Sequence, residues 1–456
     1  MPLTPVDGAT VKNNLQEQHQ HNVSTVSCTT PTTLSSDWCR DDDCGLDAEY
    51  DDNFVMTQDD ADKLVSRTQR KVRAFLEKSA WVKANSTLAD IPRLTPADFT
   101  TSRVVAEGGF SSIHEITAFH HPKDPNLKCV AQEQQRQRQQ VPGSPVPLSI
   151  TEEKEDTTDE IQQQEQRPKR YVVKHLKSEL TLNQHNLKAA MKDICNEIHI
   201  LSATNHQHII KLQAISSAGL QGCSQTCRAD SLFLVLERLD QTLLHKISQW
   251  RQEGIRKQAL DLTNLGTCSN TLALFRERVQ VAQQLASALC YLHDRRIMHR
   301  DIKPGNIGFD ADGKVQLFDF GIAVEIPHSD DPSAVFDLGN AGTARYQAPE
   351  VINKKPYNIS ADLYSFTLVL WEMMALSKAF PCLTGEEVKE SVTLIGCRPI
   401  IPKAWPKDLK RLLQSGWSRH PKQRPSMADM EVNLEAIFEK DYSKKKKSVR
   451  WFKSPF

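Results

Sequence analysis

The chain has 456 residues, enough for a large hydrophobic core and two or three domain-sized units, and its 57 basic and 57 acidic side chains cancel. No field of the whole molecule therefore attracts nucleic acid, and we expect no specific nucleic-acid partner. Scattered cysteines, no secretory leader and polar interruptions in the longest apolar stretch predict an intracellular protein without a transmembrane segment, cytoplasmic with the nucleus as a second candidate.

The first region, residues 1–56, is rich in Thr, Ser, Gln and Asn and then becomes acidic from Asp37 to Asp52. It has little periodic apolar content, so it buries too little surface to offset the entropy lost on ordering. We predict that it is disordered. The acidic cluster with Trp38 and Tyr50 is compatible with docking of a basic partner, although a solvated tail is the simpler interpretation.

Residues 57–94 are predicted to contain an amphipathic helix and a linker. Apolar residues recur at near-helical spacing from Thr57 to Val82, and Thr57 followed by acids at 59 and 60 is typical of a helix start. The apolar face must cover another part of the molecule, and the following domain is one candidate. Pro92 and Pro96 then break the pattern and place a domain boundary near residue 95.

Residues 104–113 are predicted to form a strand, a turn of small residues and a second strand that begins at Ile113. A turn around Gly108 that lacks large side chains lets backbone N–H groups approach phosphate oxygens. Taken alone, the pattern is better explained by an ordinary glycine-containing hairpin. The Gln-rich and then acidic segment 120–168 is predicted to be a disordered insertion.

A buried lysine is predicted where the apolar strand 171–174 ends. The ammonium of Lys174 needs an anion nearby, because an unpaired buried charge is costly. Glu197 is the candidate, since it lies in an apolar helical pattern over 194–201. A structural surface pair is the alternative. Residues 248–270 are a second predicted insertion, followed by a long helix over 272–292.

The stretch His299–Asn306 reads His-Arg-Asp-Ile-Lys-Pro-Gly-Asn and is the most informative part of the sequence. Its Asp301 is suited to accept a hydroxyl proton, its Lys303 to balance the charge of a phosphoryl group, and its Asn306 to bind a divalent cation. Asp319 follows a short apolar strand over 315–318 and precedes a glycine, which makes it a candidate second metal ligand.

These two segments together resemble the catalytic loop and the metal-binding Asp-Phe-Gly motif of the protein kinase family. The resemblance extends over residues 98–438 and implies an α+β, bilobal fold with a small antiparallel-sheet lobe and a larger helical lobe, here in a kinase domain over 95–440. It also implies ATP and Mg²⁺ as cofactors. The partner would be a protein substrate with a Ser or Thr hydroxyl.

Further roles follow from the resemblance, residue by residue. Lys174 paired with Glu197 would hold the α and β phosphates, and backbone groups of Glu237 and Leu239, after a gatekeeper Leu236, would bind adenine. The remaining nucleotide contacts would come from the glycine loop, at Ala106, Gly108 and Ile113. Ala106 and Ser111 stand where glycines are usual.

The end of the activation segment, 342–350, also matches the family. Thr343 with Lys303 is the pattern of serine/threonine-specific members. Glu350 is expected to pair with Arg424, and Asp362 to anchor the catalytic loop.

Two departures from the family pattern suggest hypotheses. Val172 lies where the family usually has an alanine above the adenine, and Gly308 lies where it usually has a bulky aliphatic residue below it. We therefore expect the larger side chain above the adenine cleft to compensate for the missing side chain below it, here called a bare floor. No Ser, Thr or Tyr occurs between Ser333 and Thr343. Asp337 is therefore expected to supply the fixed negative charge that Arg300 would otherwise find in a phosphate.

The thinned glycine loop leaves a pseudokinase that binds nucleotide or acts as a scaffold as the main alternative function. An adaptor that works through its charged tails is a third. The basic tail 441–456, with Lys444 to Lys447, is expected to contact an anionic surface or an import receptor, or to remain solvated.

Overall fold

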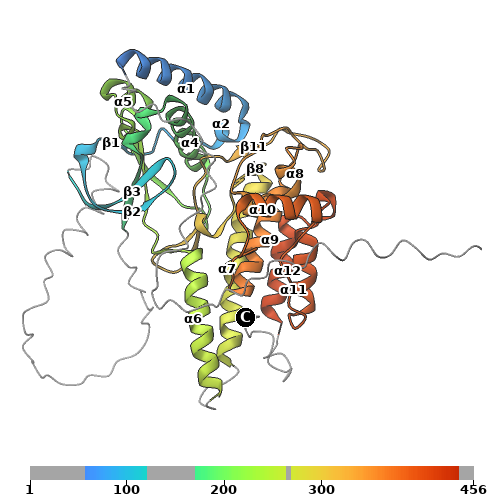
Figure 1. Cartoon of the computed structure of the whole chain (residues 1–456). Helices are drawn as coiled ribbons and strands as arrows, with labels where there is room; N and C mark the ends of the chain where they lie inside the picture. The colour runs from blue at the N-terminus through green and yellow to red at the C-terminus, as the bar shows by residue number, and fades with distance from the viewer. Residues whose placement is uncertain (1–56, 121–169, 263–268, 441–456) are drawn as a thin grey trace, which may run out of the picture. The chain divides into compact units, whose positions relative to one another are not determined.

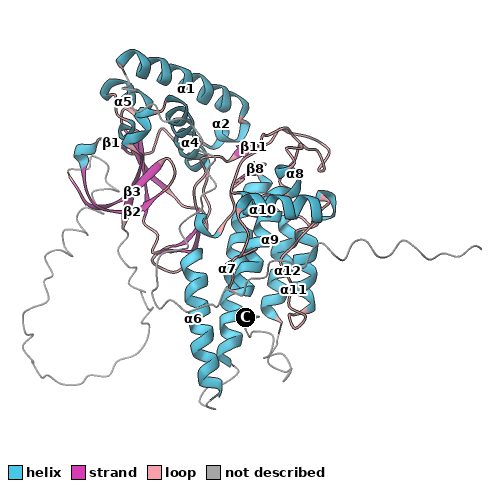
Figure 2. Cartoon of the chain, viewed as in Figure 1, coloured by secondary structure: helices cyan, strands magenta, loops and turns pink. Residues whose placement is uncertain are grey.

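The computed structural model describes residues 57–120, 170–262 and 269–440 (Figure 1). The segments 1–56, 121–169 and 441–456 lie outside the described residues, and with them the acidic cluster, the first predicted insertion and the basic tail. The described part combines one large sheet with a set of helices, coloured by type in Figure 2. The α+β class expected from the resemblance is thereby confirmed.

The large sheet has six strands in the order β1-β5-β6-β4-β3-β2. Its strands are β1 (Arg93–Leu94), β2 (Phe99–Glu107), β3 (Ser111–Phe119), β4 (Tyr171–Leu176), β5 (Leu212–Ser216) and β6 (Phe233–Glu237). Every neighbouring pair is antiparallel except β1 with β5, which is parallel. The predicted linker thus adds an edge strand that the sequence pattern did not reveal.

Side chains of β4 alternate between the two faces of the sheet, as the strand period requires. Tyr171 and Val173 belong to a small apolar cluster on one face. Val172 and Leu176 belong to the main core on the other, which is the face that receives Lys174. The strand therefore delivers the lysine to the side of the sheet where the helices pack.

Four helices accompany the sheet: α1 (Gln58–Lys78), α2 (Ala80–Asn85), α4 (Gln184–Ala203) and α5 (Gly219–Thr226). α1 packs against α4 and α5, and α2 packs against α4 (Figure 1). The predicted helix start at Thr57 is confirmed by a capping box between Thr57 and Asp60. The single helix expected from Thr57 to Val82 is broken at Ser79, whose backbone is extended and whose hydroxyl caps α2.

The larger helical part contains α6 (Leu243–Leu262), α7 (Ser269–Asp294), α8 (Pro349–Ile352), α9 (Ser360–Ala375), α10 (Gly385–Glu390), α11 (Lys407–Gly416) and α12 (Met427–Glu439). α9 is buried at every residue from Ala361 to Ala375, so it forms the centre of this part. The predicted second insertion, 248–270, lies mainly in the continuation of α6 to Leu262.

Short strands carry the chemically informative segments. β7 (Gln241–Thr242), β9 (Ile307–Phe309) and β10 (Val315–Leu317) form one small sheet, and β8 (Ile297–Met298) pairs with β11 (Val324–Glu325). One-turn 3₁₀ helices occur at Pro96–Asp98, Ser178–Leu182, Ala229–Ser231, Pro304–Asn306, Ala344–Tyr346 and Pro421–Gln423, and a π-helical turn at Ser391–Ile395. Within the described ranges, no helix combines the length and apolarity needed to span a bilayer.

Candidate active site

The loop that contains His299 to Asn306 runs from β8 to β9 and is anchored by hydrogen bonds to Asp362 of α9. The Asp362 carboxylate accepts hydrogen bonds from the backbone N–H groups of His299 (2.7 Å) and Arg300 (2.9 Å). Burial alone would raise the pKa of Asp362, but hydrogen bonds from His293 and His299 hold it below its ordinary value. Arg300 has a φ of 70°, a strained conformation that this anchoring stabilises. The expected role of Asp362 is confirmed.

Asp301 lies at the centre of a hydrogen-bonded group. Its Oδ1 accepts from the backbone N–H (2.9 Å) and the hydroxyl (2.7 Å) of Thr343, and its Oδ2 accepts from Asn306 Nδ2 at 2.8 Å. Lys303 Nζ lies 3.1 Å from Asp301 Oδ2 and donates to the Thr343 hydroxyl at 2.9 Å. A carboxylate and an ammonium held in this way are preorganised to receive a hydroxyl proton and to stabilise developing negative charge.

Gly342 brings Thr343 to this group. Its φ is +98°, and a Cβ at this position would overlap the carbonyl oxygen of Arg300. Only glycine allows the activation segment to approach the catalytic loop so closely. This contact was not predicted from the sequence.

Lys174 meets two carboxylates from different elements. Its Nζ lies 2.6 Å from Glu197 Oε2 on α4 and 2.9 Å from Asp319 Oδ1. Burial alone would lower the pKa of the ammonium, but Asp319 and Glu197 more than offset this, so its pKa lies above the ordinary value. The pairing of Lys174 with Glu197 is present as expected, and it is buried, which excludes the surface-pair alternative.

Opposite shifts mark the two carboxylates. Burial raises the pKa of Glu197 despite its contact with the lysine, whereas the Lys174 charge lowers the pKa of Asp319. The Asp319 side chain is 41% exposed, and that of Glu197 is 2% exposed. Asp319 is therefore the carboxylate that can present negative charge outward.

Asn306 and Asp319 supply the oxygen atoms that a hard divalent cation requires. The amide nitrogen of Asn306 is engaged by Asp301, through its carboxylate at 2.8 Å and its carbonyl oxygen at 2.9 Å, which leaves the amide oxygen as the donor atom. Asp319 has a φ of 69°, the left-handed region that Asp tolerates better than most residues. The donor set fits a hard divalent cation.

Asn196 is a site residue that the sequence analysis missed. From its position beside Glu197 on α4, its amide nitrogen lies within hydrogen-bond distance of three carbonyl oxygens in the segment after Asp319: Phe320 (3.2 Å), Gly321 (2.9 Å) and Ala323 (2.8 Å). It is buried at 7% exposure. A polar residue inside the apolar pattern 194–201 was the available signal.

The predicted glycine loop is a hairpin between β2 and β3. Ala106 lies opposite Ile113, and the Gly108 N–H donates to the Ser111 carbonyl at 2.8 Å to close the turn. Ile113 is in turn paired with Lys174 of β4, so the hairpin adjoins the lysine. Its contact with a nucleotide stays a prediction.

The hypothesis of a bare floor at Gly308 is wrong. A Cβ at this position would overlap Leu239 Cδ1 and lie 3.3 Å from Leu239 Cβ and Cγ, so the Leu239 side chain fills the space above the glycine. Leu239 is held there because the next residue, Asp240, donates its N–H to the Phe309 carbonyl at 2.8 Å. Adenine binding by the backbone of Glu237 and Leu239 stays a prediction.

The hypothesis that Asp337 neutralises Arg300 is also contradicted. The two residues form no ion pair in the described structure, and Asp337 Oδ1 accepts from the Gly339 N–H at 3.4 Å. The Arg300 Nε atom is buried and has no hydrogen-bond partner among the described residues, and the nearby Tyr357 hydroxyl donates to the Gly339 carbonyl at 2.8 Å.

The structural ion pair expected between Glu350 and Arg424 is confirmed. It is bidentate, with distances of 2.6 and 2.8 Å, and both residues are buried.

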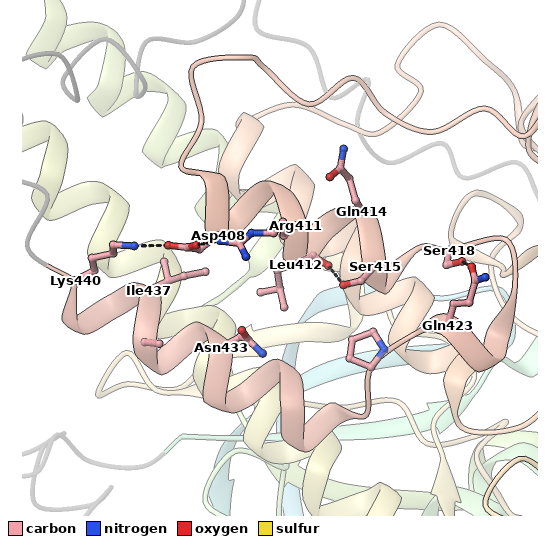
Figure 3. A pocket seen from close by; sticks show the side chains of 12 residues that line it. Asp408, Arg411, Leu412, Gln414, Ser415, Ser418, Gln423, Asn433, Ile437 and Lys440 are labelled. Atoms are coloured by element: carbon pink, nitrogen blue, oxygen red, sulfur yellow. Dashed lines mark hydrogen bonds and ion pairs between the residues drawn. The ribbon is translucent and has the colours of Figure 1, made fainter.

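A groove of about 740 Å³ lies between α11 and α12 and shares no residue with the site described above (Figure 3). Its charged side chains pair with one another: Asp408 contacts both Arg411 and Lys440. Its Leu412 and Ile437 side chains are buried in the core. The groove therefore offers no free charged group for phosphate chemistry.

The comparisons with known proteins agree with this geometry. The family described as protein kinase domain matches residues 160–434, more than half of the chain. The chain is 27% identical over 240 residues to the serine/threonine-protein kinase STY17 of Arabidopsis thaliana, covering 53% of this chain and 36% of that protein. It is 33% identical over 168 residues to the dual specificity protein kinase shkB of Dictyostelium discoideum (36% and 25%).

A third similar protein is the serine/threonine-protein kinase Nek1 of Mus musculus, 34% identical over 174 residues, or 38% of this chain and 13% of that protein. The chain thus spans less than two fifths of the length of each of these relatives. The match to the family includes the strand of Lys174, the loop of Asp301 and the segment of Asp319, and the last of these contacts both of the others. The chain belongs to the protein kinase family.

Proposed function

We propose that the chain is an ATP-dependent protein kinase that transfers the γ-phosphoryl group to Ser or Thr hydroxyls of protein substrates. The observation that carries the proposal is the contact of Lys174 with both Glu197 and Asp319, at 2.6 and 2.9 Å. This contact joins the sheet, α4 and the metal-binding segment around the Lys174 ammonium. Family membership and the intact charged residues support the same conclusion.

In the proposed mechanism, Mg²⁺ held by Asn306 and Asp319 would neutralise the charge of the nucleotide phosphates. Lys174 orients those phosphates from the sheet side. Asp301 orients the substrate hydroxyl and accepts its proton, and Lys303 stabilises the charge on the transferring group. Catalysis then depends mainly on positioning and electrostatics, with no covalent intermediate on the protein.

Ser/Thr specificity is the finer part of the proposal. It is supported by the contact of Lys303 with the Thr343 hydroxyl at 2.9 Å, next to the Asp301 carboxylate. The printed names of the relatives include both serine/threonine and dual specificity kinases. Tyrosine-containing peptides must therefore be included in any substrate test.

The second candidate function is a pseudokinase that binds nucleotide or partners without transferring phosphate. The feature that favours it is the glycine loop, in which Ala106 and Ser111 replace glycines. Against it stand Lys174, Asp301 and Asp319, since a scaffold has no need for all three. An adaptor that works through the charged tails is the third candidate. Contacts of the basic tail with an anionic surface or an import receptor are a further proposal, and so is an intracellular location.

Transfer of radiolabel from ATP to generic Ser, Thr and Tyr substrates, together with nucleotide binding by calorimetry, separates these candidates. Asp301→Asn is expected to lower transfer by about 10²-fold or more, because it removes the acceptor of the hydroxyl proton. Asp312→Asn, at an exposed aspartate in the turn between β9 and β10, is the matched control. Binding of Mg-ATP without transfer by any form would favour the pseudokinase, and absence of binding the adaptor.

A further inference from the structure

α1 lays an apolar stripe across α4 and α5. Its buried residues, at helical spacing, are Ala61, Leu64, Val65 and Thr68. The start of the helix is fixed on α5, because Gln58 Nε2 donates to the Ser224 carbonyl at 2.7 Å and the Ser224 hydroxyl donates to Asp62. α1 therefore contributes to the core that α4 shares, and its outward face carries the basic residues.

Glu325 links α2 to the segment that follows Asp319. Its carboxylate accepts hydrogen bonds from the Ser79 hydroxyl and from the Trp81 N–H, the latter at 3.3 Å. Ser79 is 2% exposed and the Glu325 side chain 7% exposed. A guanidinium nitrogen of Arg296 lies 3.9 Å from the same carboxylate. Withdrawal of α2 would leave a buried carboxylate short of donors, which is costly.

The residues after α2 close the C-terminal end of α4. Ser86 Oγ lies 2.8 Å from Ser202 Oγ, and the N–H and hydroxyl of Thr87 donate to the Ser202 carbonyl at 2.9 and 2.8 Å. Carbonyl groups in the last turn of a helix have no partner within the helix. The N-terminal segment thus supplies such a partner and fixes this end of α4.

α4 is the helix that presents Glu197 to Lys174 and Asn196 to the carbonyls of residues 320–323. Glu325 lies two residues beyond Ala323, so residues at the start of α2 and in α4 hydrogen-bond the same short segment. We propose that residues 57–88, called here the N-terminal brace, position α4 so that Glu197 reaches Lys174, and that Glu325 is the positioning residue that ties the brace to the metal-binding segment. This deepens the proposed function, on which its catalytic consequence rests.

The test compares two full-length variants that place the same side chain on opposite faces of α1. Leu64→Glu puts a carboxylate into the buried stripe, whereas Lys71→Glu puts it on the exposed face. Amide hydrogen exchange is measured along the chain without nucleotide. Leu64→Glu is expected to speed exchange in α4 by about tenfold or more while α7 and α9 keep the wild-type rate, and Lys71→Glu is expected to change neither.

The catalytic readout separates positioning from simple loss of stability. In Leu64→Glu, kcat should fall by about tenfold or more while the KM for the protein substrate, which binds elsewhere, stays within about twofold. If Leu64→Glu instead speeds exchange in α7 and α9 as well, it destabilises the whole domain. Glu325→Gln and Ser79→Ala, which leave the apolar stripe intact, then test the proposal. Each is expected to speed α4 exchange by about three- to tenfold.

Exchange in α4 within about twofold of wild type in all of these variants would overturn the proposal. Amide exchange can be measured without catalysis. A chain that transfers no phosphate would therefore refute the proposed function, while the exchange rate in α4 would still test the role of the N-terminal brace. Conversely, full phosphate transfer with unchanged α4 exchange in Leu64→Glu refutes the brace and leaves the kinase assignment standing.

Discussion

The hydroxyl of Thr343 donates to Oδ1 of Asp301 at 2.7 Å and accepts from Lys303 Nζ at 2.9 Å, so one side chain of the activation segment connects the proposed base to the proposed charge clamp. Thr343→Val keeps the shape and removes the hydroxyl. We expect kcat to fall by about ten- to a hundredfold, because the carboxylate and the ammonium lose their common partner. Thr343→Ser should retain most of the activity. Equal kcat values for the Val and Ser variants would contradict this.

Gly308→Ala is expected to weaken nucleotide binding, because the added methyl overlaps Leu239 and forces the hinge segment, residues 237–239 after β6, to move. Calorimetry should show a Kd for ATP raised by about fivefold or more. Leu239→Ala in the same chain should restore affinity by making room. Gly254→Ala in α6, where the new methyl would reach only Leu376 at 4.0 Å, is the control and should bind as wild type. Equal affinity of both alanine variants would mean that Leu239 moves freely.

Arg424→Met leaves the Glu350 carboxylate buried without its partner and should lower the free energy of unfolding by about 3 to 5 kcal/mol. Arg411→Met breaks an ion pair whose arginine side chain is 76% exposed, and should cost about 1 kcal/mol or less. Urea unfolding measures both. A smaller loss for Arg424→Met than for Arg411→Met would refute the assignment.

Glu372 predicts a pH dependence of stability. Burial raises the pKa of this carboxyl from 4.5 to about 7, against hydrogen bonds from the Ala379 N–H and the Tyr346 hydroxyl. A pKa higher in the folded than in the unfolded chain gives stability that is complete below 4.5 and is lost as the pH rises to about 7.

Relative to Glu372→Gln, the wild-type free energy of unfolding should therefore fall by about 2 to 3 kcal/mol between pH values of about 5 and 8. Urea unfolding of both proteins across this range provides the measurement. Parallel pH curves for the two proteins would show that the Glu372 carboxyl titrates normally.

The contacts of Tyr357 with the activation segment predict activity without a phosphate there, since Tyr357 already holds the segment through a backbone bridge to Phe336 and a hydroxyl bond to the Gly339 carbonyl at 2.8 Å. Phosphatase-treated protein should keep its kcat, and Asp337→Ala should change kcat by less than about twofold, because Asp337 does not pair with Arg300. Loss of turnover after phosphatase treatment would indicate that a phosphorylated residue is required.

Charged residues at characteristic spacings were sufficient to predict much of the site. Lys174 was paired correctly with Glu197, because a buried ammonium needs an anion nearby. Glu350 was paired correctly with Arg424 from the resemblance to the kinase family. The strands around the glycine loop and the helix start at Thr57 were also predictable, since both depend on local pattern.

The predictions that failed concern contacts between residues that are far apart in the sequence. Leu239 could not be placed over Gly308 from the sequence, because the position of a hinge side chain is decided by tertiary packing. Asp337 was chosen by charge alone, whereas its carboxylate accepts a hydrogen bond from the Gly339 N–H and forms no ion pair with Arg300. Asn196 was overlooked although it interrupts an apolar helical pattern, because its partners are backbone carbonyl groups that no side-chain motif identifies.

The parallel pairing of Arg93 and Leu94 with Ile215 and Ser216 has a practical consequence for any fragment of this chain. A piece that begins at the predicted boundary near residue 95 would leave one margin of the sheet with unsatisfied main-chain groups, which invites association with other copies. Such a piece would also uncover the side of α4 that α1 and α2 protect. Recombinant work aimed at a well-behaved catalytic fragment should therefore begin before Thr57.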